Sequence, residues 1–253
     1  MCCFSRAVEH VSETQIFARP VAGGRQALIY SMRIKAGEDL AMILPIPVAQ
    51  PAREDAVQFV SLEEYPDLFA GLRRGFPEAA ARASFGGSRG DAHALGPAPL
   101  KVLDVGSFSA SFVPTIRDFA RLDPQFRLPD GVWEKLGPYA SYGFTVFKLK
   151  KGEARIHPMA FVFPTAIPDR LFFPTVHIHD GIVHRRANFD HALYCQIARG
   201  GLRSLASWDE SAGPASRFVN TKSAKNLILP EQHVFRRRLA GEHDNEDVTL
   251  RVA

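Results

Sequence analysis

An Asp-Gly dipeptide at residues 180–181 constrains the local fold of this chain more tightly than any other sequence feature. The runs on both sides are β-prone, and Asp-Gly between such runs favours a type I′ turn, since both central residues need a positive φ. A two-residue loop also fixes the register of the hairpin. It pairs His179 with Ile182 and His177 with His184. The sequence therefore predicts an antiparallel β-hairpin here.

Three histidines share one face of this predicted hairpin. Side chains alternate between the two faces of a strand, so His177, His179 and His184 lie on the same side. Directly opposed Cβ atoms in such a pair are about 4.5–5.5 Å apart. Imidazoles at that spacing repel when protonated and favour neutral rings or a shared cation. We predict a zinc or copper site on these three residues. Candidates for further ligands are Cys2, Cys3 and His191. The alternative is a polar strand face without a ligand.

The rest of the chain alternates β-prone runs with turn residues, which predicts an α+β fold of mainly antiparallel sheets. The sheets form either a sandwich or two packed hairpin units. The segments 28–47 and 144–164 share a Lys-x-Gly-Glu turn and a strand that ends in proline, so the units are candidates for an internal repeat. Short helices are expected at 53–75 and within 115–137, where one covers 115–122 and another covers 129–136. Strands are expected at 8–18, 25–36, 40–46, 101–113, 144–149, 156–163, 170–179, 182–186, 189–197 and 234–239.

Length and composition favour one globular domain over residues 1–253. Hydrophobic residues make up 46% and charged residues 23%, and the formal net charge is +4. No dense basic stripe is present, so nucleic-acid binding is not expected. No apolar run of about 18 residues and no signal-peptide core are seen, which predicts a cytoplasmic protein without membrane contact. Residues 77–99, rich in Ala, Gly, Ser and Arg, read as a flexible loop or linker. The acidic stretch within 242–253 reads as a solvated C-terminal tail.

Three cysteines do not make a disulfide framework, so each is expected as a free thiol, a ligand or a nucleophile. Removal of Met1 would leave Cys2 with a free α-amine, which can act as the base for its own thiol. That arrangement defines an alternative function, an N-terminal cysteine hydrolase. Adjacent thiolates of Cys2 and Cys3 are also soft ligands for zinc or copper if the first strand packs beside the histidines.

Several short hydrophobic motifs follow in a characteristic order. They are Leu44-Pro45-Ile46-Pro47, then Tyr139 with the strand 143–149, then His157-Pro158-Met159. In this order the chain resembles a bacterial family of uncharacterised proteins, a domain of unknown function, over residues 8–180. The resemblance implies no activity. The sequence thus predicts an uncharacterised bacterial protein with a metal-binding hairpin. The two alternatives are the cysteine hydrolase and a non-catalytic β-rich interaction module.

Overall fold

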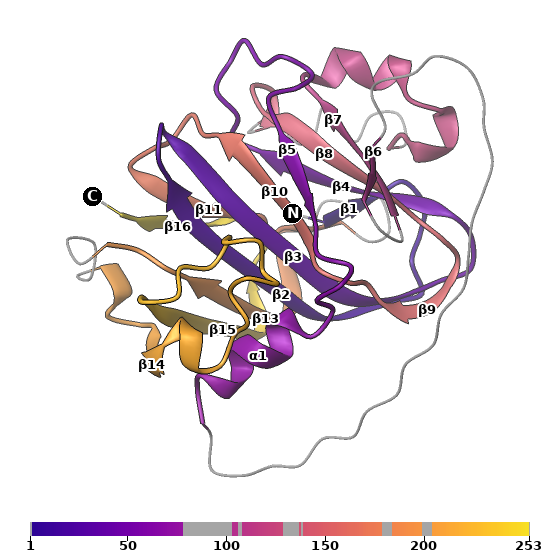
Figure 1. Ribbon diagram of the computed structural model, residues 1–253. Coiled ribbons are helices and arrows are strands. Elements are labelled where there is room, and N and C mark those ends of the chain that lie inside the picture. The colour runs from indigo at the N-terminus through magenta and orange to yellow at the C-terminus, as the bar shows by residue number, and fades with distance from the viewer. Residues whose placement is uncertain are drawn as a thin grey trace.

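The computed structural model describes residues 2–77, 103–105, 108–128, 137, 139–178, 184–198 and 204–252. Within these residues the strands form three sheets (Figure 1). The larger sheet runs in the order β14 (Asp209–Pro214), β15 (His233–Asp244), β13 (Arg186–Cys195), β2 (His10–Val21), β3 (Arg25–Ala36), β10 (Met159–Pro164) and β5 (Gln58–Ser61), and β9 (Gly152–Arg155) also pairs with β3. The smaller sheet runs in the order β12 (His177–Ile178), β1 (Cys2–Phe4), β4 (Leu40–Ile46), β8 (Gly143–Leu149), β7 (Phe108–Val113) and β6 (Leu103–Val105). The strands β11 (Arg170–Phe173) and β16 (Val248–Arg251) make a separate pair.

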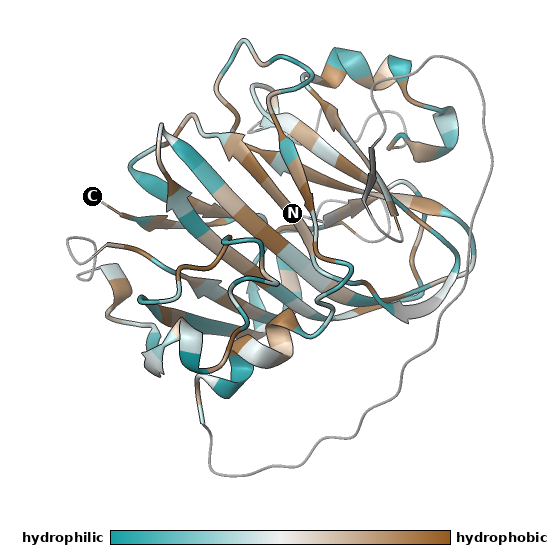
Figure 2. Ribbon diagram, in the orientation of Figure 1, coloured by the Kyte–Doolittle hydropathy of each residue, from teal (hydrophilic) through white to brown (hydrophobic). Residues whose placement is uncertain are grey.

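Apolar side chains pack in three layers, one between the two large sheets and one on the outer face of each. The strand β4 shows how the sequence produces this arrangement, because all seven of its residues are buried. Met42 and Leu44 point into the layer between the sheets, whereas Ala41 and Ile43 point into the outer layer of the smaller sheet. A near-continuous apolar run is typical of a strand covered on both faces. Hydrophobic segments along the central strands are visible in Figure 2.

Each of the two candidate repeat units, 28–47 and 144–164, contributes one strand to the larger sheet and one strand to the smaller sheet. In the first unit, β3 lies in the larger sheet and β4 in the smaller one; in the second, β8 lies in the smaller sheet and β10 in the larger one. Pairing is reciprocal, since β3 pairs antiparallel with β10 and β4 pairs antiparallel with β8. This confirms the predicted α+β architecture of mainly antiparallel sheets packed face to face.

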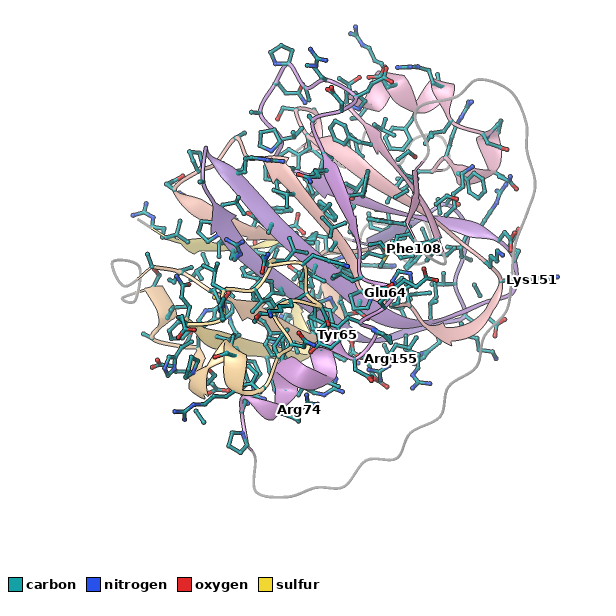
Figure 3. All side chains as sticks on the ribbon, in the orientation of Figure 1. Glu64, Tyr65, Arg74, Phe108, Lys151 and Arg155 are labelled. Atoms are coloured by element: carbon teal, nitrogen blue, oxygen red, sulfur yellow. The ribbon has the colours of Figure 1, made fainter. Side chains whose placement is uncertain are left out.

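The helix predicted over 53–75 is wrong over most of its length. The first part of the segment forms β5, whose Phe59 pairs with Phe161 and packs edge-on against Phe147. An α-helix, α1 (Leu68–Arg74), begins after Pro66, which cannot continue a helix from the preceding residues. Tyr65 and Arg74 then hold the loop after β14: the hydroxyl of Tyr65 accepts the backbone N–H of Asn220, and Arg74 donates to a backbone carbonyl (Figure 3).

The short helix predicted at 115–122 is present as a 3₁₀ helix, η1 (Ile116–Arg121), and a second one that the sequence analysis did not predict, η2 (Pro124–Phe126), follows it. Asp123 separates them because its side chain accepts the backbone N–H of Gln125 at 3.1 Å, an interaction that begins a new turn. Residues 129–136 lie outside the described residues. Another 3₁₀ helix, η5 (Ala215–Arg217), follows β14.

The solvated tail predicted for 242–253 is also corrected. The strand β15 continues to Asp244, and β16 pairs with β11 and buries Leu250. The acidic composition was misleading because Asp247 uses its carboxylate to bind backbone N–H groups of another segment. The loop or linker predicted at 77–99 lies, apart from Pro77, outside the described residues. None of the helices described is long and apolar enough to cross a membrane.

Candidate functional site

The first histidine strand has a different partner from the one predicted. The strand β12 pairs in parallel with β1, so that Cys2 is registered with His177 and Cys3 with Ile178. The next strand, β13, begins at Arg186 and belongs to the larger sheet. No ladder joins the described residues 177–178 to 184–186. The predicted turn and the inner pairs of the hairpin, including His179, lie outside the described residues.

One side-chain amide brings the backbones of His177 and His184 together. The Oδ1 atom of Asn245 accepts the N–H of His177 at 2.8 Å, and its Nδ2 atom donates to the carbonyl of His177 at 2.9 Å. The same Nδ2 atom donates to the carbonyl of His184 at 3.0 Å. An amide side chain thus takes the place that a neighbouring strand would occupy on the outer edge of β12.

A carboxylate two residues later fixes the chain just before β12. Asp247 accepts the backbone N–H groups of Thr175 at 2.8 Å and Val176 at 3.0 Å through Oδ1. Its Oδ2 atom accepts the hydroxyl of Tyr139 at 2.6 Å. Burial, and then the negative charge of Asp247, raise the pKa of Tyr139, so the phenol stays protonated and donates. We call Asn245 and Asp247 the clamp of β12.

The histidine nearest to His177 across the sheets is His191 on β13. Their Nε2 atoms are 3.0 Å apart, and the ring of Phe189 packs against both imidazoles. His191 is 2% exposed, and its Nδ1 atom lies 3.7 Å from Oδ1 of Asp190. Two neutral imidazoles at this distance share one N–H, one ring donating and the other accepting.

Asp190 links this histidine pair to β2. Burial opposes its ionisation, but the nearby imidazole of His191 and a hydrogen bond from the backbone N–H of Glu13 outweigh that effect and lower the pKa of Asp190. The carboxylate is therefore ionised at neutral pH and remains an acceptor for the backbone of β2.

The predicted ligands are brought together in part. His177 and His191 are in contact, and the backbone of Cys2 lies beside His177. Cys3 is fully buried in the outer layer of the smaller sheet, and the His184 residue is exposed. Within the described part of the chain, no group of three or more His, Cys, Asp or Glu side chains is arranged to hold a metal ion.

The thiol of the remaining cysteine, Cys195, is not expected to be reactive. Cys195 is fully buried in the layer between the sheets, and burial raises the pKa of its thiol. The thiolate is the reactive form of cysteine, so this residue does not provide a nucleophile. The N-terminal mechanism based on Cys2 stays a prediction.

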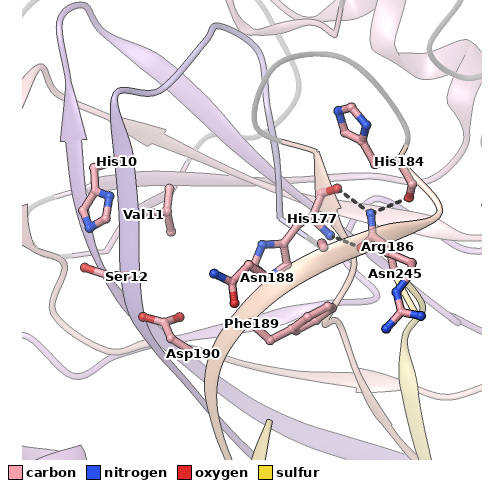
Figure 4. Close-up of a pocket in the computed structure, with 11 residues that line it drawn as sticks. His10, Val11, Ser12, His177, His184, Arg186, Asn188, Phe189, Asp190 and Asn245 are labelled. Carbon is pink, nitrogen blue, oxygen red and sulfur yellow. Dashed lines mark hydrogen bonds between the residues drawn. The ribbon is translucent and has the colours of Figure 1, made fainter. Parts of the chain in front are cut away.

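A cavity of about 470 Å³ opens beside the histidines (Figure 4). No local sequence pattern indicates this cavity, because its walls come from the beginnings of two strands that are far apart in the chain. One wall is the start of β2 and the other is the first half of β13, and His177, His184 and Asn245 complete it. The lining residues are His10, Val11, Ser12, His177, His184, Arg186, Ala187, Asn188, Phe189, Asp190 and Asn245.

The cavity exists because β2 and β13 diverge. Their parallel ladder begins with Gln15 and Ala192 and continues toward the carboxyl ends of both strands. Just before it, the register of β2 with β3 shifts between Ser12 and Gln15, and Glu13 adopts a φ of 52°. A bulge of this kind bends a strand and interrupts its pairing. We call the resulting opening between residues 10–12 and 186–190 the fork.

Comparison with known proteins finds a likeness in fold. No protein-family model and no curated protein matches this chain. Among solved structures, baculovirus P35 is similar, with a TM-score of 0.51 and 14% identity over 96% of this chain and 97% of that chain. A mutated baculovirus P35 after caspase cleavage has the same TM-score and identity, over 96% of this chain and 100% of that chain. At this identity the likeness establishes a shared fold along nearly the whole length of both chains.

Proposed function

We propose that this protein is an interaction module that a caspase-class cysteine protease binds and cleaves. The observation that carries the proposal is the likeness to baculovirus P35, which extends over 96% of this chain and includes a form of P35 after caspase cleavage. The burial of Cys3 and Cys195 also supports a partner role, since neither thiol is placed for catalysis.

The proposal predicts where the chain is cut. Residues 78–102 join α1 to β6 and are rich in small residues, the composition at which proteolytic nicking is concentrated. Because caspases cut after aspartate, Asp91 is the candidate, the single aspartate of that segment. Both large sheets combine strands from before and after the segment. We therefore expect the two fragments to remain associated after cleavage.

The test is incubation of the purified protein with a panel of caspases, followed by intact-mass measurement and size-exclusion chromatography. The expected result is one cut after Asp91, with both fragments eluting as a single species. Asp91→Ala should abolish cleavage, and Asp169→Ala, at an exposed aspartate between β10 and β11, should leave it unchanged. Absence of cleavage by every caspase, or cleavage at the same rate in Asp91→Ala, would contradict the proposal.

The position of β1 beside β12 supports a second candidate function, binding of Zn²⁺ or Cu⁺. The contact between His177 and His191 supplies two imidazoles, and the register of β1 brings the backbone of Cys2 to His177. Imidazole and thiolate are suitable ligands for both ions. His179 and His184, from the predicted hairpin, complete the candidate set.

Calorimetric titration of untagged protein with Zn²⁺, and with Cu⁺ under anaerobic conditions, tests this function. We expect one equivalent of metal to bind and His177→Gln to weaken binding at least tenfold. His233→Gln is the matched control, because His233 lies on β15 and outside the candidate set. Affinity that is the same in the wild type and in His177→Gln would remove the metal site.

A further inference from the structure

We propose that the fork binds an extended, uncharged segment of a partner protein that adds a strand beside β13. In this segment, apolar residues that face the layer between the sheets alternate with polar residues that face solvent. The inference goes beyond cleavage by a caspase and can be tested without any protease. The fork has the size of a ligand site, since binding pockets are usually about 300–1,000 Å³ and this cavity has a volume of about 470 Å³.

The lining residues show that the cavity is bounded by strand edges. Side chains alternate between the faces of a sheet, so a pocket on one face is lined by every second residue. Here the lining is consecutive: residues 10–12 on β2 and residues 186–190 on β13. Consecutive residues meet a cavity when it lies in the plane of the sheet, between two backbones. Figure 4 shows the two strands on opposite sides of the opening.

The direction of the β13 backbone groups follows from the ladder between β13 and β15. The N–H of Asn245 donates to the carbonyl of Arg185, so in this register the odd-numbered residues of β13 bond to β15. The N–H and C=O groups of residues 186, 188 and 190 therefore point the other way, toward the fork. At the far end of the strand the N–H of Gln196 donates to β2, in agreement with this alternation.

These backbone groups have no ladder partner among the described residues, since the pairing of β13 with β2 begins at Ala192. The open edge from residue 186 to residue 190 is about 13 Å long, at about 3.3 Å per residue. An extended segment of four or five residues fits that length. Addition of a strand to an open edge is an established mode of peptide recognition, in which main-chain hydrogen bonds hold the peptide.

The inner side of the fork is apolar. Val11 on β2 and Ala187 on β13 are half-buried, and both pack against the layer of apolar side chains between the sheets. Phe189, on the same face of β13 as Ala187, is buried in that layer. Burial of apolar surface is favourable in proportion to the area that it removes from water. An inward-facing apolar side chain of the added strand extends this layer and covers its half-buried end.

The outer side of the fork is polar. Arg186, Asn188 and Asp190 lie on the outer face of β13 and are exposed. Successive side chains of the added strand point to opposite faces, so every second one lies beside these residues and in contact with water. The segment that fits therefore alternates apolar and polar residues, and threonine suits its polar positions because it is also favoured in strands.

The charged side chains of the described lining are already compensated within the protein. The guanidinium of Arg186 lies 3.5 Å from the carboxylate of Glu242 and donates to the carbonyl of that residue at 3.3 Å. The carboxylate of Asp190 accepts the N–H of Glu13 and lies 3.7 Å from Nδ1 of His191. An ionised side chain that enters the fork loses hydration without gaining an uncompensated partner. The complementary segment is therefore uncharged.

Two blocked pentapeptides of identical composition serve as probes, Thr-Val-Thr-Val-Thr and Val-Val-Thr-Thr-Thr, each N-acetylated and C-amidated. Binding is followed by shifts of backbone amide signals in ¹H–¹⁵N NMR spectra of the full chain. We expect the alternating peptide to bind at least fivefold more tightly and to shift the amides of Val11 and Asn188. An alternating peptide with N-methyl groups on every second residue should lose binding, because it cannot donate to β13.

The requirement for an uncharged segment has its own probes. The first and last Thr of the alternating peptide are replaced with Asp in one version and with Lys in another. We expect neither version to bind more tightly than the uncharged peptide, because Arg186 and Asp190 are already compensated.

The matched protein variants are Val11→Asn and Val252→Asn. Both valines are half-buried and pack against the layer between the sheets, but only Val11 lines the fork. The first variant should weaken binding of the alternating peptide at least fivefold, and the second should leave it unchanged. Circular dichroism checks that both variants are folded, and the peptide comparisons with the wild type do not depend on either variant.

Five outcomes would overturn the proposal. They are no binding at millimolar peptide, equal binding of the two peptides of identical composition, tenfold tighter binding of either charged version, shifts confined to other strands, and dimerisation of the protein through the fork that excludes the peptide.

Discussion

Two strand edges in this molecule differ in whether other groups of the chain cover their backbone. The outer edge of β12 is covered, because the amide of Asn245 bonds to both the N–H and the C=O of His177. The edge of β13 that faces the fork has no ladder partner among the described residues until Ala192. Open edges invite pairing with other chains, and proteins usually block them. We therefore expect the cover of β12 to contribute to stability, whereas the described residues provide no such cover for this edge of β13.

The largest expected effect comes from the covered edge. Replacing Asp247 with alanine leaves the N–H groups of Thr175 and Val176 and the hydroxyl of Tyr139 without their acceptor. Hydrogen bonds to a charged group contribute about 1.5–3 kcal/mol each and are not additive, so we expect a loss of about 4 kcal/mol in the free energy of unfolding. Urea denaturation measures it. Glu246→Ala, at the neighbouring exposed carboxylate, should change stability by less than about 0.5 kcal/mol. If Asp247→Ala and Glu246→Ala lose the same free energy of unfolding, the hydrogen bonds of Asp247 do not account for the loss.

Asn245→Ala should have the next largest effect, about 2 kcal/mol, since it removes the amide that covers β12. Asn245→Asp separates the two halves of that interaction. It keeps the acceptor for the N–H of His177 but loses the donor to the carbonyls of His177 and His184. Hydrogen exchange at the amide of Ile178 reports the local opening. If exchange there is unchanged in both variants, β12 is held by β1 alone.

The smallest effect concerns the closed end of the fork. Asp190 has a lowered pKa in the folded protein, so its contribution to stability is present above the unfolded value of about 3.9 and is lost as the pH falls through the folded value. Asp190→Asn should therefore cost about 1 kcal/mol at pH 7, a figure reduced by solvent screening of this half-exposed group. The difference in free energy of unfolding between the wild type and Asp190→Asn should narrow below pH 4. A gap that is constant between pH 7 and pH 3 would show that the charge of Asp190 plays no part.

Much of the fold was predictable because strands leave a local signal. The buried run of β4 and the alternation along β8 were readable, and proline marked the ends of β4 and β10. The prediction of one helix at 53–75 is wrong because the apolar residues of a short strand and a short helix together resemble one irregular helical stripe. Pro66 marks the boundary before the helix, but the short apolar run that precedes it does not by itself distinguish a strand from a helix.

The site was less predictable because its contacts join residues far apart in sequence. Local turn chemistry proposed His184 as the partner of His177, yet the structure brings His191 to the imidazole and Asn245 to the backbone. The choice among neighbours is made by the packing of the two sheets, which a pattern of alternating residues does not encode. The same holds for the fork, which arises from a bulge at Glu13 and the divergence of two distant strands.

The pairing of β1 with β12 has a consequence for synthesis of the chain. Residue 2 is made long before its ladder partner, residue 177. At about 5–20 residues per second, roughly 10 to 35 s pass on the ribosome before that partner exists. The other neighbour, β4, is available much earlier, so β1 first docks along one side alone. Contacts between such distant residues also slow folding, and β1 is therefore expected to reach its final environment late.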